Sequence, residues 1–264
     1  MQNFKNLEDI SKKIRRLIID VSYKAGSPHT ACCLSCVEIL VALYFYKLRM
    51  KNFKKRDIFV LSKAHAALSL YCTLMLRGFL SKKDLYSFYS NGGKLPAHLD
   101  RFTNKAIEAS CGSLGHGFSI ALGMAYGYKI KKDKRKVFTL IGDGEAEEGS
   151  IWEGALFASR LNIDNFVVIL DYNNLQGYGF VNKICYFEPI KDKWQAFGWD
   201  VVVIDGHNFK EIINALDKPN NRKPRIIIAK TIKGKGISFM ENDLKWHYYV
   251  VTKDIRDKAY KELL

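Results

Sequence analysis

Apolar residues near the start of the chain recur at helical spacing. They are Ile10, Ile14, Leu17, Ile18 and Val21. Residues three or four apart share one face of an α-helix, so a helix is predicted here. Residues 25–30 contain a glycine and a proline and interrupt the pattern. A second helix is expected over residues 35–47, where apolar side chains again dominate.

Five short apolar runs are predicted to be strands. They cover residues 58–61, 137–141, 166–170, 201–204 and 225–229. Helix-length segments separate them, and helical patterns are clear over 66–77 and 151–161. Strands that are apolar on both faces and alternate with helices form parallel sheets covered on both sides. The sequence therefore predicts an α/β fold, with one domain over residues 1–264 and a mostly parallel, twisted sheet covered by helices on both faces.

Polar residues follow two of these runs directly. Asp143 stands between two glycines after the run 137–141, and Asn173 follows the run 166–170. Ligands of such sheets bind where loops leave the carboxyl ends of strands. A carboxylate, a carboxamide and a backbone carbonyl can hold a hard divalent cation, and a diphosphate can complete its octahedron. Gly-Asp-Gly alone is also a common turn, so the partner asparagine is what favours a metal-bridged diphosphate.

The chain carries a formal net charge of +15 at pH 7. Its lysines are spread along the sequence, without zinc-finger spacings or an RNA-recognition signature. We attribute the charge to solvated faces and to attraction for phosphorylated substrates, and nucleic-acid binding is the less favoured alternative. No apolar run is long enough to cross a bilayer, and no secretory signal follows Met1. A cytoplasmic location without membrane attachment is expected.

Cys33 and Cys36 form a C-x-x-C pair. Such a pair can indicate a redox or zinc site. Here it begins an apolar helical run, and no second pair supplies the remaining zinc ligands. We therefore interpret these cysteines as small buried hydrophobic residues.

The order and spacing of Asp143 and Asn173 resemble the signature of thiamine-diphosphate enzymes. The separation is 173 − 143 = 30 residues, which fits one strand–helix–strand crossover. Further segments resemble transketolases, in the same order along roughly residues 10 to 262. These segments are Ala25–His29 with Leu34–Ser35, Leu61–Ala66, Leu95–His98, Gly112–Gly117, Lys230–Gly236 and Trp246–His247.

The resemblance implies transfer of a two-carbon ketol unit from a ketose phosphate to an aldose phosphate. The implied cofactors are thiamine diphosphate and Mg²⁺, with Ca²⁺ or Mn²⁺ as substitutes. Asp143, Asn173 and the carbonyl of Leu175 would bind the metal. The implied cofactor-binding residues are His65, Gly112, Leu114, Gly144, Asn173 and Glu148. The implied catalytic residues are His29, His98 and His247, with His98 near the transferred end of the donor and the other two in proton transfer.

Other polar residues receive less specific interpretations. His116 stands at a family position and is taken as structural. His207 is expected to cap the following helix with Asn208, without a catalytic role. Glu145 and Glu147 are explained as carboxylates at a helix start. Glu148 alone matches a family glutamate in an acidic network across the subunit interface.

Relatives with this resemblance continue into a pyrimidine-binding domain, whereas this sequence ends soon after His247. The chain thus resembles the separately encoded N-terminal subunit of a split transketolase. A C-terminal subunit with the pyrimidine-binding domain is the expected partner, in an α2β2 assembly, and the chain alone should be inactive. Another thiamine-diphosphate synthase or transferase subunit, or a non-catalytic assembly subunit, are the alternatives.

Several residues depart from the family pattern. They are Pro28, Thr30, Cys32, Cys33, Gly177 and Tyr178. The departures spare the expected metal ligands but alter the expected sugar pocket. They leave the donor and acceptor sugars open.

Overall fold

The five apolar runs form five parallel strands in the computed structural model, which describes residues 4–49, 55–219 and 221–263. The strands are β1 (Ile58–Leu61), β2 (Val137–Gly142), β3 (Phe166–Tyr172), β4 (Asp200–Asp205) and β5 (Arg225–Lys230). Their order in the sheet is β1-β2-β3-β5-β4. Gly142 at the end of β2 pairs with Asp171 near the end of β3. The loops that carry Asp143 and Asn173 therefore leave the same edge of the sheet side by side, as predicted.

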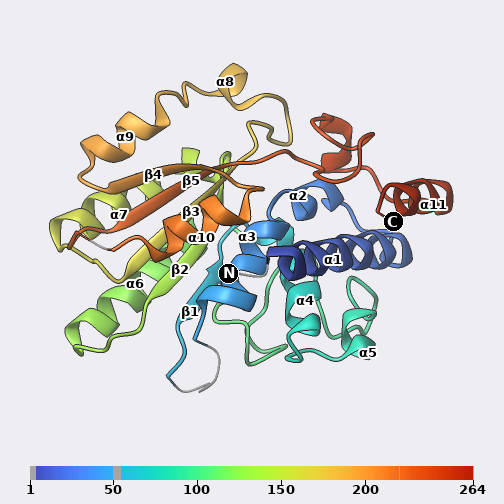
Figure 1. Cartoon of the computed structure of the whole chain (residues 1–264), viewed down its shortest axis with the longest axis horizontal. Coiled ribbons are helices and arrows are strands. Elements are labelled where there is room, and N and C mark those ends of the chain that lie inside the picture. The colour runs from blue at the N-terminus through green and yellow to red at the C-terminus, as the bar shows by residue number, and fades with distance from the viewer. Residues whose placement is uncertain (1–3, 50–54, 220, 264) are drawn as a thin grey trace.

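Helices cover both faces of this sheet (Figure 1). They are α1 (Phe4–Ala25), α2 (Thr30–Ser35), α3 (Val37–Ala42), α4 (Ala67–Leu76), α5 (Lys82–Leu85), α6 (His116–Ile130), α7 (Gly149–Arg160), α8 (Val181–Ile184), α9 (Ile190–Ala196), α10 (Phe209–Asp217) and α11 (Lys253–Glu262). Within the described ranges, none of these helices is long and apolar enough to cross a membrane.

The alternation of side chains along each strand divides the core into two layers. On β3, Val167 and Ile169 pack in the layer shared with α1, α3, α4 and α10. Phe166, Val168 and Leu170 pack in the other layer, with α6, α7 and α9. Both faces of the strand are buried, which explains why the sequence shows a continuous apolar run instead of an alternating one.

The helix predicted over about residues 35–47 is confirmed at its end, Lys47, but it is interrupted at Cys36 and helical structure begins earlier. Helix α2 covers Thr30–Ser35, and α3 continues directly into a π-helical turn over Leu43–Lys47. The break lies at Cys36, whose φ and ψ are −103° and 13°. It is accompanied by a tertiary contact in which the Ser35 hydroxyl donates to Asp171 of β3 at 2.6 Å. The apolar pattern continues through Cys36, so the break leaves no local signal.

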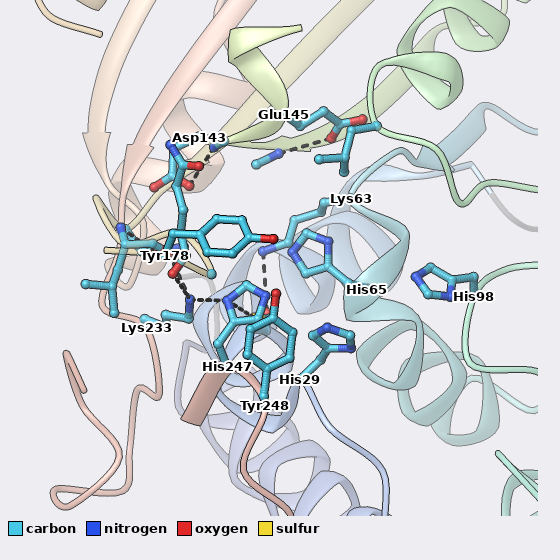
Figure 2. A pocket seen from close by; sticks show the side chains of 18 of the residues that line it. His29, Lys63, His65, His98, Asp143, Glu145, Tyr178, Lys233, His247 and Tyr248 are labelled. Atoms are coloured by element: carbon cyan, nitrogen blue, oxygen red, sulfur yellow. Dashed lines mark hydrogen bonds between the residues drawn. The ribbon is translucent and has the colours of Figure 1, made fainter. Parts of the chain in front are cut away.

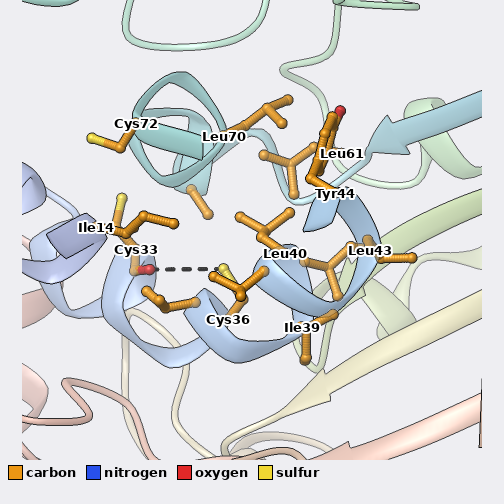
Figure 3. Packing of buried hydrophobic residues seen from close by; sticks show 14 of the residues in the cluster. Ile14, Cys33, Cys36, Ile39, Leu40, Leu43, Tyr44, Leu61, Leu70 and Cys72 are labelled. Atoms are coloured by element: carbon orange, nitrogen blue, oxygen red, sulfur yellow. Dashed lines mark hydrogen bonds between the residues drawn. The ribbon is translucent and has the colours of Figure 1, made fainter. Parts of the chain in front are cut away.

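The C-x-x-C pair is buried in the apolar layer beside α1 and α4 (Figure 3). The Cys36 thiol donates to the carbonyl of Cys33 at 3.8 Å, and both thiols are free. Burial raises the pKa of each of these thiols to about 12. The interpretation of this pair as small hydrophobic residues is confirmed.

Candidate active site

A cavity of about 330 Å³ opens at the carboxyl edge of the sheet. Its walls come from the loops that follow β1, β2, β3 and β5, together with the segments around His29, His98 and Leu114. Among the cavity residues labelled in Figure 2, Asp143 and Lys233 lie at one end and His98 lies at the other. The cavity therefore has a charged end and a histidine-rich end.

Asp143 and Asn173 both line the charged end. Asp143 is only 4% exposed, and its Oδ1 accepts the amide of Gly144 at 2.9 Å. Its Oδ2 is buried and has no hydrogen-bond partner among the residues that the structure describes. The Asn173 carboxamide oxygen accepts the amide of Leu175 at 3.2 Å. These oxygens occur in neighbouring loops, as the prediction of a shared site requires.

The electrostatics of Asp143 favour a nearby cation. Burial and the Asp171 charge raise the pKa of Asp143 to about 6. A buried carboxylate oxygen without a partner is costly, and a divalent ion would offset that cost. Within the described ranges, no cluster of three His, Cys, Asp or Glu residues is arranged to hold a metal. A metal here would depend on one carboxylate, neutral oxygens and a ligand such as a diphosphate, and these donors suit Mg²⁺.

Lys233 supplies a cation that the sequence interpretation missed. It is 1% exposed, and its ammonium donates to the carbonyls of Leu175 at 2.9 Å and Gln176 at 3.3 Å. It also lies 2.7 Å from Nδ1 of His247. Burial lowers the pKa of Lys233. The predicted metal-ligand carbonyl of Leu175 thus already faces a positive charge, and Lys233 is placed to contact an anion bound beside it.

A second lysine, Lys63, is buried in the cavity wall in an ion pair with Asp171. Burial lowers the pKa of Lys63, but the Asp171 charge outweighs it and keeps the pKa raised. Asp171 also accepts from the hydroxyls of Ser35 and Thr231. Three donors occupy the oxygens of Asp171, so it is not available as a metal ligand. It connects β3 to the segments that carry these donors.

Four of the five histidines placed at family positions meet in the cavity. The ring centroid of His29 lies 5.2 Å from that of His247, 5.7 Å from that of His65 and 6.4 Å from that of His98. Burial, the neighbouring His98 and Lys233 lower the pKa of His29 to about 4. Burial and Lys233 lower that of His247 to about 3. Both rings are neutral at pH 7, so they can donate and accept hydrogen bonds.

His116 is the fifth histidine, and it does not join the others. It begins α6 and is exposed, with no side-chain hydrogen bond to any described residue. The structure therefore gives no contact that would support the structural role predicted for it.

The remaining predicted cofactor residues divide into two groups. Gly112 and Leu114 line the cavity from the loop before α6, and Gly144 lines it from the loop after β2. The Gly144 amide donates to Asp143, so its donation to a diphosphate stays a prediction. Glu148 precedes α7, is exposed and lies outside the cavity lining.

Glu145 was interpreted as a carboxylate at a helix start; it does begin the helical turn Glu145–Glu147, but its side chain also makes buried contacts that this interpretation missed. It is 2% exposed and accepts the hydroxyl of Ser62 and the amides of Gly115 at 2.9 Å and Gly142 at 3.2 Å. One buried carboxylate thus joins the loops after β1 and β2 to the start of α6. Glu147 is partly exposed and accepts from Gln176.

Two tyrosines cover the histidine-rich end (Figure 2). The Tyr248 ring lies 4.6 Å from the His247 ring and 5.8 Å from the His29 ring. A Cβ added at Gly177 would lie 2.7 Å from the Tyr248 hydroxyl, so the Tyr248 side chain would have to shift. Tyr178, 85% exposed, lines the same cavity. Gly177 and Tyr178, which depart from the family pattern, therefore lie in the same part of the cavity as Tyr248.

The expected cap by His207 is wrong. The Asn208 carboxamide alone caps α10, accepting the amides of Lys210 at 3.0 Å and Glu211 at 3.3 Å. The His207 ring instead contacts Glu38 and the backbone of Ile232, so its side chain serves a tertiary network.

Comparisons with known proteins agree with this geometry. A family model described as transketolase, thiamine diphosphate binding domain, matches residues 7–259. The chain is 39% identical to the 6-deoxy-6-sulfo-D-fructose transketolase subunit of Clostridium sp. strain MSTE9, over 98% of this chain and 96% of that protein. It is also 39% identical to an apulose-4-phosphate transketolase subunit of Phocaeicola vulgatus, over 97% and 93% of the two chains.

Among solved structures, the transketolase of Campylobacter jejuni superposes with a TM-score of 0.92 at 32% identity. The match covers 99% of this chain but 43% of that one. The chain thus spans nearly the full length of the two relatives named as subunits, and less than half of the crystallised transketolase.

Proposed function

Because the chain belongs to the transketolase family and matches its thiamine diphosphate-binding domain, we propose that it is the N-terminal subunit of a two-subunit transketolase. Its activity is transfer of a ketol unit between sugar phosphates, in complex with a second subunit. The observation that carries this proposal is the unpartnered, buried Oδ2 of Asp143, which opens on a cavity that also contains four histidines.

The charged end of the cavity fits the diphosphate and metal of the cofactor. Asp143, Asn173 and the carbonyl of Leu175 would hold Mg²⁺, and Lys233 would contact the diphosphate. Gly144 lines this end, and a Cβ there would lie 3.0 Å from the Gln176 side chain, which would have to shift. Bound thiamine diphosphate supplies the nucleophile and the electron sink for carbon–carbon cleavage.

The histidine-rich end suits a sugar chain. We assign His29 and His247 to the proton transfers with the sugar; the neutral His247 ring offers its Nε2 proton, because Nδ1 accepts from Lys233. His98 is exposed at the outer side of the group and would hydrogen-bond the donor sugar. The two tyrosines would restrict water at the cavity mouth. The names of the relatives differ in their sugars, so the physiological sugar pair of this chain is to be determined by assay.

An exposed apolar surface beside the cavity supports a partner subunit. Leu114 lines the cavity, and Ile120 follows it on α6. Leu156 is 59% exposed and Phe157 44% exposed on α7, which packs against α6. Exposed apolar side chains on elements that pack together are typical of protein interfaces. We assign it to the C-terminal subunit with the pyrimidine-binding domain, in an α2β2 assembly whose cavity is completed by that subunit.

Reconstitution tests this function. The chain is mixed with its second subunit, thiamine diphosphate and Mg²⁺, and ketol transfer is followed from a panel of ketose phosphates to ribose 5-phosphate. Activity is expected only when both subunits and both cofactors are present, and it should disappear in the Asp143→Asn variant. A folded complex that binds the cofactor but transfers no ketol unit from any donor would contradict the transketolase function.

A further inference from the structure

A buried charge network lies behind the cavity and outside its lining. The Arg15 guanidinium on α1 donates twice to Glu38 on α3, at 2.5 and 2.8 Å. Glu38 also contacts Nδ1 of His207 at 2.9 Å. Arg15 is 6% exposed and Glu38 is 7% exposed. Buried charges persist where each has partners, and here every member is paired.

The network makes two hydrogen bonds to the backbone of the loop that follows β5. The amide of Ile232 donates to Nε2 of His207 at 2.9 Å. The Arg15 Nε donates to the carbonyl of Lys235 at 2.8 Å. These two contacts flank Lys233, whose ammonium faces the charged end of the cavity. Arg15 and His207 thus hold the backbone on both sides of Lys233, which lines the cavity.

The hydrogen bonds also fix the state of the imidazole. An amide can donate only to an unprotonated ring nitrogen, so Nε2 of His207 carries no proton. The ring proton then lies on Nδ1, where it can be donated to the Glu38 carboxylate. Glu38 therefore selects the tautomer that accepts the Ile232 amide.

We propose that His207 is a positioning residue for the diphosphate site, which it serves through the Ile232 amide and hence through Lys233. This inference rests on the proposed function, because it takes the anion at Lys233 to be a diphosphate. It gives a role to the Asp205–Asn208 segment, whose histidine neither caps α10 nor reaches the cavity.

Two near-isosteric variants separate this role from general packing. In His207→Gln, the side-chain oxygen can take the place of Nε2 and accept the Ile232 amide. In His207→Asn, the shorter amide can still reach Glu38 but not Ile232. The dissociation constants of thiamine diphosphate, with saturating Mg²⁺, and of pyrophosphate are measured on the reconstituted complex. His207→Asn should weaken both by about tenfold, as expected for one lost hydrogen bond, while His207→Gln should stay within about threefold of the wild type.

A double-mutant cycle tests whether His207 acts on cofactor affinity through Lys233. In a Lys233→Gln background, His207→Asn should cause no further loss of affinity, because the residue it positions is gone. An equal loss in the two His207 variants, or the same tenfold loss in the Lys233→Gln background, would overturn the proposal. If His207→Asn does not fold, a folded His207→Gln that loses tenfold in affinity overturns it as well. Absence of ketol transfer with this affinity pattern intact would contradict the proposed function and leave the positioning role standing.

Discussion

The ammonium of Lys233 lies 2.7 Å from Nδ1 of His247, so a buried cation donates to a neutral imidazole at the junction of the two ends of the cavity. Since Nδ1 accepts this bond, the ring proton of His247 lies on Nε2. One side chain therefore couples the anion-binding end to a histidine proposed for proton transfer. A change at Lys233 should affect both ends.

Replacement of Lys233 by methionine should weaken thiamine diphosphate binding by roughly tenfold or more, because a charge-assisted contact is lost. It should also lower the turnover number, because His247 loses the donor that fixes its tautomer. Lys235→Met is the matched control, since Lys235 points to Glu241 at 3.6 Å. Calorimetric titration and steady-state rates on the reconstituted complex provide the measurements. Equal losses in the two variants would mean that only the charge of the loop matters.

Asp143→Asn should abolish stabilisation by thiamine diphosphate with Mg²⁺, because ligand-dependent stabilisation requires binding to the folded state. Without cofactor, the same variant should melt at a higher temperature than the wild type, because it removes a buried, partly unpartnered carboxylate. Differential scanning calorimetry with and without cofactor measures both effects. Glu147→Gln serves as the control. A preserved cofactor-induced shift in Asp143→Asn would remove this residue from the metal site.

Replacing a cavity histidine should lower the turnover number, whereas replacing His116 should not. His29→Gln should lower the turnover number by roughly 10² to 10⁴, the usual range for loss of a positioned proton-transfer group. The affinity for the cofactor should change little. His116→Gln should behave as the wild type, since the His116 ring lies outside the cavity. Comparable losses of turnover in both variants would speak against a specific role for His29.

Glu38 should make part of the folding stability dependent on pH. Burial raises its pKa, but Arg15 and His207 outweigh burial and hold the pKa at about 2 in the folded chain, against an ordinary value of 4.5. A lowered carboxyl pKa stabilises the fold above pH 4.5, and that contribution disappears as the pH falls toward 2. Glu38→Gln should cost on the order of 3 kcal/mol at pH 7.

Urea denaturation between pH 7 and pH 3.5 provides the measurement for Glu38. The difference in unfolding free energy between the wild type and Glu38→Gln should shrink as the pH falls. Asp84→Asn is a surface control, since its carboxylate pairs with the exposed Lys94. A constant difference across this pH range would show that the charge of Glu38 does not stabilise the fold.

Thiol labelling should separate the cysteines by exposure. Cys185 is exposed, while the other cysteines are buried and the thiols of Cys33 and Cys36 have a pKa of about 12. Thiolates are the reactive species, so Cys185 should react first with a disulfide reagent in the folded chain. The Cys185→Ser variant should lose this fast phase. Fast labelling of the C-x-x-C pair in the folded chain would contradict its burial.

The strands and the Asp143–Asn173 pair could be predicted because their signals are local. Each strand is one continuous apolar run, and one crossover between β2 and β3 places the two polar loops side by side. Lys233 and Glu145 could not be recognised in this way. Both are charged residues near glycines, which usually indicates an exposed turn, and their burial depends on partners far along the chain. For Lys233 these partners are Leu175 and Gln176, and for Glu145 they include Ser62.

The same limit applies to His207 and to the helix break at Cys36. His207 contacts Glu38, 169 residues away in the sequence, and Ile232. Ser35, beside the break, donates to Asp171, 136 residues away. No periodicity or spacing encodes such pairs. Tertiary packing decides them, and local propensity has little weight there.

The amide of His29 donates to the carbonyl of His247 at 2.9 Å, so an early loop of the chain is closed by one near its end. During synthesis, a ribosome-bound fragment that stops before residue 247 lacks one wall of the pocket. Thiamine diphosphate therefore has no complete site to capture on a nascent chain, and the apolar layers of the sheet must guide the early stages of folding unaided. Cofactor loading therefore requires that the segment around His247 has been synthesised and has docked on the loop around His29.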